Sequence, residues 1–104
     1  MTKIVSVSVQ RELRQLGVHV NQMRKVLGMT ADLLARRAGV TRTTLRSIER
    51  GDGTARLDNV VSVLSVLGCA RGVVDATDPM RTELGRLRLE QGLPKRVRIP
   101  KDAL

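Results

Sequence analysis

The stretch from Thr30 to Arg50 has the pattern of two short helices joined by a tight turn. Thr30 can accept the first free amide hydrogens of one helix. Gly39 follows that helix, where a residue without a Cβ can take the left-handed conformation that ends it. Thr41 is the N-cap of the second helix. Because so short a pair buries little apolar surface by itself, helices before and after it must complete a core.

The second helix of this stretch has an apolar side and a polar side. Leu45 and Ile48 recur at the spacing of a buried helical face. The pattern places five polar side chains on the opposite, outward face: Arg42, Thr43, Arg46, Ser47 and Arg50. A helix with hydrogen-bonding and cationic side chains outward suits the DNA major groove.

The run from Leu27 to Gly51, LGMTADLLARRAGVTRTTLRSIERG, resembles the Cro/CI-type (XRE) helix-turn-helix family. The resemblance rests on a small residue in the first helix of the pair, on the turn, and on two short sequences in the second helix: Ala35, Gly39-Val40-Thr41, Thr44-Leu45 and Ile48-Glu49-Arg50-Gly51. It extends from about Leu13 to Gly68. It implies an all-α fold, a five-helix Cro/CI repressor-like domain, here with an extra C-terminal helix.

The resemblance also implies which residues meet DNA. The expected base-contacting residues are Arg42, Thr43, Arg46 and Ser47, although any of them could contact phosphate instead. Arg42 is the strongest candidate, because an arginine can hold O6 and N7 of guanine with two hydrogen bonds. The expected backbone-contacting residues are Thr30, Thr41, Thr44, Arg50, Thr54 and Arg56. For Arg56, a solvated arginine is the alternative.

Two further implications concern the helices around the motif. The resemblance implies a structural ion pair between Arg24 and Glu49, which ties the preceding helix to the end of the second motif helix. The family usually has glutamine where Ala31 stands, so the phosphate clamp at the start of the first motif helix is weaker here or shifts to Thr41 and Thr44. Leu33 occupies a position that is normally polar, which indicates contact with another chain.

The segment before the motif divides into an arm and a long helix. Alternating valines predict a short strand over residues 2–9, which would need a partner edge; a disordered arm explains them equally well. An apolar stripe predicts a helix from Val9 to Leu27 that Gly28 ends. Gly17 inside this helix indicates a bend or a close contact.

A fourth helix is expected over residues 57–67. Its predicted core residues are Leu57, Val60, Val61, Leu64 and Leu67. This assignment leaves Val63 and Val66 outside, so we expect the helix to touch a fifth helix or a second subunit as well.

The last third of the chain is predicted as two helices and a tail. A fifth helix spans residues 70–76, and Asp78 and Pro79 open a further helix that Gly92 stops. The basic tail adds phosphate contacts or pairs with the N-terminal strand across a dimer. The predicted division is an arm at 1–8, the DNA-binding domain at 9–77, a C-terminal helix at 78–92 and the tail at 93–104.

Composition narrows the partners. The net charge of +9 favours phosphate polymers, and the absence of Phe, Tyr and Trp disfavours binders that stack unpaired bases on aromatic rings. Cys69 is the only cysteine, so neither an intrachain disulfide nor a multi-cysteine zinc site is expected. There is no signal-peptide pattern and no apolar run of about 20 residues. We expect a cytoplasmic protein without cofactor, metal or membrane partner.

The sequence leaves the biological role open between related alternatives. One is a transcriptional regulator, most simply a repressor that binds an inverted repeat as a homodimer. Another is a HipB-like antitoxin that binds DNA and also holds a toxin such as a HipA-type kinase, and a phage lysis–lysogeny regulator is compatible with the same core. An enzyme is not expected, because no nucleophile–base pair, metal-ligand cluster or phosphate-binding glycine loop is present.

Overall fold

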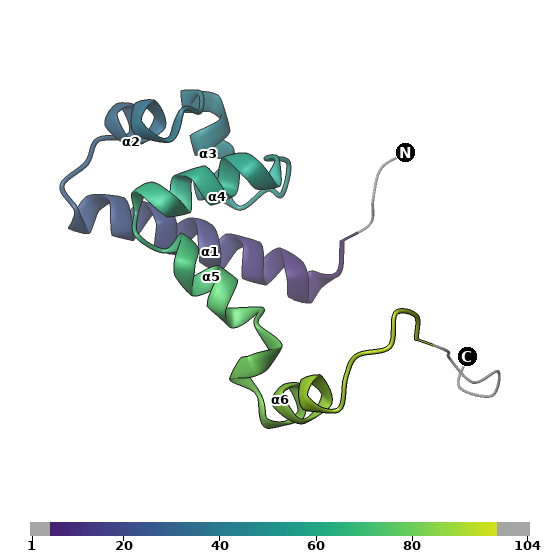
Figure 1. Cartoon of the computed structure of the whole chain (residues 1–104). Helices are drawn as coiled ribbons and strands as arrows, with labels where there is room; N and C mark the ends of the chain where they lie inside the picture. The colour runs from purple at the N-terminus through teal and green to yellow at the C-terminus, as the bar shows by residue number, and fades with distance from the viewer. Residues whose placement is uncertain (1–4, 98–104) are drawn as a thin grey trace. The chain divides into compact units, whose positions relative to one another are not determined.

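The computed structural model describes residues 5–97, and within this range helices are the only regular elements, as expected for an all-α fold (Figure 1). Its helices are α1 (Val7–Val26), α2 (Ala31–Ala38), α3 (Arg42–Arg50), α4 (Leu57–Val66), α5 (Ala70–Ala76), the short 3₁₀ helix η1 (Pro79–Arg81) and α6 (Glu83–Glu90). Contacts divide the chain into one unit of residues 1–72 and another of residues 73–104. The functional division at residues 8, 77 and 92 stays a prediction.

The start of α1 contradicts part of the predicted N-terminal strand. Ser6 is the N-cap of α1, and its hydroxyl accepts a hydrogen bond from the amide of Val9 at 3.2 Å. Residues 7–9 are therefore helical, and the strand prediction is wrong for them; residues 2–4 of that prediction lie outside the described residues. A few alternating valines do not outweigh a serine cap joined to the long apolar stripe that follows.

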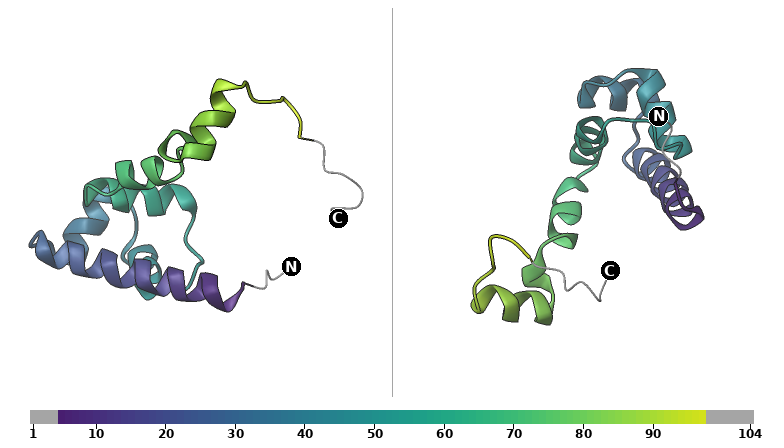
Figure 2. Two further views of the ribbon diagram at one scale, coloured as in Figure 1. Left: turned by 90° about the horizontal axis from the view of Figure 1, so that it is seen from below. Right: turned by 90° about the vertical axis from the view of Figure 1, so that its right-hand side faces the viewer.

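The core of the first unit lies among α1, α2, α3 and α4 (Figure 2). Its buried apolar residues are Val20, Met29, Leu34, Ala35, Leu45, Ile48, Val63, Leu64 and Leu67. The helix α1 packs against α3, and α2 packs against both α3 and α4. The two motif helices are thus held from both sides, which fixes the outward face of α3.

A close backbone contact explains Gly17. The residue is buried on α1, and a Cβ built there would lie 2.7 Å from the carbonyl oxygen of Ile48 in α3. Of the two predicted reasons for this glycine, the structure supports the close contact. The missing side chain lets α1 approach the end of α3 directly.

The predicted buried face of α4 is partly wrong. Val63 is fully buried rather than outward, whereas Leu57 is 77 % exposed and Val61 is 39 % exposed. Leu64 and Leu67 are buried as predicted. Because α4 is apolar on most sides, its residues fit more than one helical face, and only packing against α2 selects the face that includes Val63.

The predicted helix after Pro79 is broken in two. Asp78 accepts a hydrogen bond from the amide of Met80, but η1 ends at Arg81 and Thr82 is extended. The Thr82 hydroxyl caps α6 by accepting from the amide of Gly85 at 2.9 Å, and this capping contact competes with helix continuation. No residue from 73 to 97 is buried.

Among the described residues, no single helix is long and apolar enough to cross a membrane. The consecutive helices α4 and α5 together meet the length and composition of a broken span, but they are bent at the break. Val63 and Leu64 of α4 lie in the protein core.

Candidate nucleic-acid interface

Local sequence sets the geometry of the helix-turn-helix pair. The hydroxyl of Thr30 accepts from the amide of Leu33 at 3.1 Å and begins α2. Gly39 ends α2 with φ of 70°, and the amide of Val40 closes the turn onto the carbonyl of Ala35 at 2.9 Å. Thr41 then caps α3 by accepting from the amide of Thr44 at 3.0 Å. Both predicted motif helices are confirmed with these boundaries.

The outward face of α3 carries four exposed or partly exposed polar side chains that the sequence predicted there. They are Arg42, Thr43, Arg46 and Arg50. The opposite face carries Leu45 and Ile48, which are 1 % and 6 % exposed. A rigid helix therefore presents arginine and threonine side chains at successive turns, which is the arrangement that major-groove contacts need.

Ser47 does not lie on this outward face, and its predicted exposure is wrong. Ser47 is only 8 % exposed. Its hydroxyl donates a hydrogen bond to Asp52 and lies 2.7 Å from the hydroxyl of Thr54. At 3.6 residues per turn, Ser47 lies between the polar and apolar faces, and the returning loop covers it. Ser47 therefore supports the loop that follows α3.

The same loop engages Thr54, which was expected at the DNA backbone. The Asp52 carboxylate accepts from the amide of Thr54 at 3.1 Å and from its hydroxyl at 2.8 Å. Hydrogen bonds from Ser47, then from the Thr54 backbone and hydroxyl, lower the pKa of Asp52 from 3.8 to about 2. The Thr54 side chain thus holds the loop together, while Arg50 reaches the other oxygen of Asp52 at 3.4 Å.

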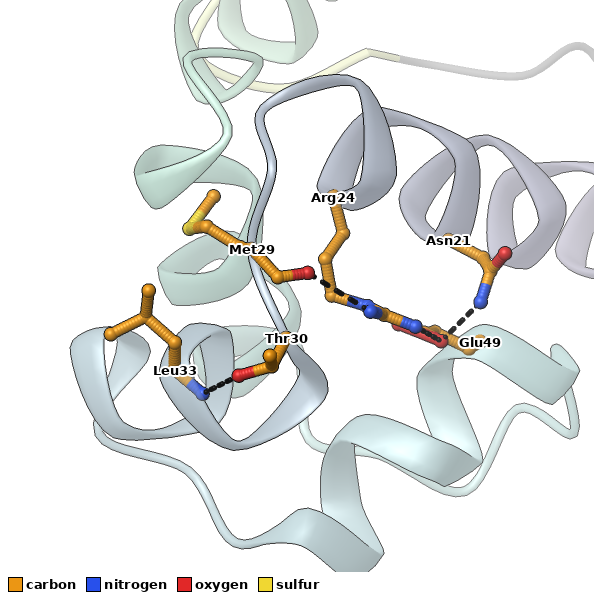
Figure 3. A network of polar contacts seen from close by, with 6 residues as sticks. All are labelled: Asn21, Arg24, Met29, Thr30, Leu33 and Glu49. Carbon is orange, nitrogen blue, oxygen red and sulfur yellow. Dashed lines mark hydrogen bonds and ion pairs between the residues drawn. The ribbon is translucent and has the colours of Figure 1, made fainter.

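A half-buried polar network fixes α1 against the motif (Figure 3). Arg24 and Glu49 form the expected ion pair, with Nε and Oε2 3.0 Å apart and side chains 12 % and 14 % exposed. Arg24 also donates to the carbonyl of Met29 at 3.1 Å, and Asn21 donates to Glu49 at 2.7 Å. Burial raises the pKa of Glu49, but the hydrogen bonds from Arg24 and Asn21 outweigh it and keep this pKa below its usual value.

Arg42 has a partner that was not predicted from the sequence. Its Nη1 lies 2.6 Å from Oδ1 of Asp32, in the first turn of α2. The hydrogen bond from Arg42, together with its positive charge, lowers the pKa of Asp32. The available signal was a carboxylate at the start of one motif helix and an arginine at the start of the next, which the turn brings side by side.

Arg56 lies at the N-cap of α4, outside the Ser47–Thr54 loop network. Its side chain is 81 % exposed, and its Nε lies 3.2 Å from Oδ1 of Asp58. Exposed pairs of this kind between near neighbours in the chain contribute little to stability. Arg56 is therefore free to exchange Asp58 for another anion.

A depression of about 350 Å³ is lined by residues of α1, α2 and α3. Its lining includes Ala31 from α2 and three arginines of α3: Arg42, Arg46 and Arg50. The small side chain of Ala31 leaves this space beside cationic groups. Among the described residues, no cluster of His, Cys, Asp and Glu could hold a metal ion.

The fold and this surface define a helix-turn-helix protein. A model of the family described as Helix-turn-helix matches residues 20–73, just over half of the chain. The chain belongs to this family, in its Cro/CI (XRE) type, and is a DNA-binding regulator. No curated protein matches the chain.

Proposed function

We propose that this protein is a transcriptional repressor that binds an inverted DNA repeat as a homodimer, with α3 of each subunit in the major groove. The observation that supports it is the exposed row of Arg42, Thr43, Arg46 and Arg50 on a helix that packing and the Arg24–Glu49 pair hold rigidly. Rigid presentation matters because base reading needs fixed hydrogen-bond geometry.

The proposed contacts divide into base and backbone contacts. Arg42, Thr43 and Arg46 meet base edges. Thr30, Thr41, Thr44, Arg50 and Arg56 meet phosphates, together with the amides at the start of α2. Ser47 leaves the base-reading set and Thr54 leaves the backbone-contacting set, because both act through the loop after α3. The protein acts in the cytoplasm, and the proposal includes no catalytic step and no cofactor.

The apolar side chains of residues 73–97 support the homodimer. Val73, Val74, Met80, Leu84 and Leu87 are between 45 % and 61 % exposed, and no residue in this range is buried. Helices this short are unstable unless their apolar side chains are covered. A second copy of the same unit would cover them and would place two α3 helices on one duplex.

The same exposed residues favour one alternative function, an antitoxin that holds a protein toxin such as a HipA-type kinase. Sedimentation equilibrium of the purified protein separates the two. A stable dimer at micromolar concentration supports self-association through this unit. A monomer that copurifies stoichiometrically with a kinase-like protein from its native cell supports the antitoxin.

The direct test is selection of bound DNA from a random duplex library by the wild type and by Arg42→Ala. We expect the wild type to retain an inverted repeat and Arg42→Ala to lose about tenfold or more of its preference at one base pair in each half-site. Arg11→Ala, which removes an exposed arginine of α1, is the charge-matched control and should keep the motif. Retention of DNA without any motif would contradict a sequence-specific regulator.

A further inference from the structure

The ion pair between Asp32 and Arg42 joins the two helices of the motif at the proposed DNA-binding surface. The Oδ1–Nη1 distance is 2.6 Å, and the Arg42 and Asp32 side chains are 51 % and 64 % exposed. Exposed pairs add little to stability, so this contact has its main effect on the orientation and charge of the guanidinium group. An aspartate carboxyl is already ionised at neutral pH, and the hydrogen bond from Arg42 lowers the pKa of Asp32 further.

The stereochemistry of the pair leaves Arg42 able to read a base. A guanidinium group has five N–H donors on three nitrogens, and Asp32 engages Nη1. The edge formed by Nε and Nη2 stays available for two acceptors, such as O6 and N7 of guanine. Arg42 can therefore hold Asp32 and a base at the same time, and Asp32 restricts the plane in which the group lies.

The charge of the pair acts differently on phosphate. An unpaired arginine is attracted to any DNA backbone, whatever the sequence. The neighbouring carboxylate opposes that attraction for Arg42. Arg46 provides the contrast, because within residues 5–97 it makes no ion pair.

The local pair between Arg56 and Asp58 differs in kind. Those residues are two positions apart at the start of α4, so their contact links no separate elements. The Asp32–Arg42 contact spans the turn between α2 and α3. It therefore couples the position of α2 to the orientation of the principal base-reading side chain.

We propose that Asp32 is a specificity-determining residue, which holds Arg42 in position for a base and weakens its contact with phosphate. This inference rests on the proposed function, in which Arg42 reads a base pair. In this role an acidic side chain on a cationic surface raises the ratio of specific to non-specific affinity for DNA.

The test compares Asp32→Ala with Glu12→Ala, which removes the same charge from an exposed site on α1. Affinities are measured for the selected repeat and for a scrambled duplex of equal length, at several salt concentrations. We expect Asp32→Ala to bind the scrambled duplex more tightly and to lose about tenfold of its preference at the Arg42 base pair. Glu12→Ala should change both affinities by the same small factor. An equal ratio of the two affinities in Asp32→Ala and Glu12→Ala would overturn the proposal.

The double variant Asp32→Ala/Arg42→Ala separates this inference from the proposed function. If the wild type selects no motif, or if Arg42→Ala keeps full preference, the proposed reading by Arg42 fails. If Arg42→Ala loses its preference at one base pair, adding Asp32→Ala to it should cause no further loss of preference there. A further loss would show that Asp32 acts without Arg42, which also overturns the inference. Circular dichroism melting of each variant checks that the fold is kept.

Discussion

Single carboxylates set much of the local order around the interface. Glu49 receives hydrogen bonds from two residues of α1 and lies in α3, so one side chain fixes two helices. Asp52 accepts hydrogen bonds from Ser47 of α3 and from the amide of Thr54, and so fixes the loop after α3. Through these hydrogen bonds the two carboxylates fix the helix and the loop that carry the exposed arginines.

The Asp52 network predicts an acid-dependent loss of stability. In the folded protein the pKa of Asp52 is lowered from 3.8 to about 2, first by the hydrogen bond from Ser47. A lowered pKa stabilises the fold above 3.8, and this contribution is lost as the pH falls from 3.8 to about 2. We expect the wild type to exceed Asp52→Asn in free energy of unfolding near neutral pH, and the difference to shrink across that window. Urea denaturation at successive pH values measures it.

The control for this pH series is Glu12→Gln, which removes a carboxylate of α1 without touching the loop. A wild-type advantage over Asp52→Asn that stayed constant down to pH about 2 would show that the Ser47 and Thr54 hydrogen bonds do not depend on the charge of Asp52.

At the scale of elements, α1 and α3 pack closely beside the interface. Gly17 permits it, because a Cβ there would meet backbone atoms of Ile48 and Glu49. Backbone cannot move aside as the end of a flexible side chain can. The position of α3 therefore depends on the absence of one methyl group in α1.

We expect Gly17→Ala to lower the free energy of unfolding by about 1–2 kcal/mol, since overpacking outweighs the gain in helix propensity. Gly72→Ala is the matched control, because Gly72 is also helical but has no atom within 4 Å of a built Cβ. That variant should raise the free energy of unfolding by about 0.5–1 kcal/mol. Thermal and urea denaturation measure both. A higher free energy of unfolding for Gly17→Ala would contradict this expectation, because it would mean that α1 and α3 can move apart without loss of stability.

At the scale of the whole molecule, the two units differ in how they bury apolar surface. Residues 1–72 enclose a core, whereas residues 73–97 contain no buried residue. The second unit therefore needs a covering surface, and the proposed homodimer supplies one. Affinity for an inverted repeat then depends on a segment outside the helix-turn-helix motif.

We expect Leu84→Glu to convert the protein to a monomer, because Leu84 is 61 % exposed on α6 and a charge there opposes burial in an interface. Affinity for the full repeat should fall by about 100-fold or more, while affinity for one half-site should change little. Sedimentation equilibrium and DNA titration measure the two effects. Val18→Glu alters a half-exposed valine of α1 and is the control. A dimeric Leu84→Glu protein would place the interface elsewhere.

The sequence by itself determined α2, α3 and the turn between them, because a threonine cap and a left-handed glycine act within a few residues. It also determined the outward face of α3 where Leu45 and Ile48 fix the period. Tertiary structure decided what depends on distant partners. Packing chose the buried face of the mostly apolar α4, the returning loop buried Ser47, and the packing of α2 against α3 brought Asp32 to Arg42. Local hydrogen bonds can be deduced from neighbours in the chain, whereas burial and ion pairing depend on which surfaces meet after folding.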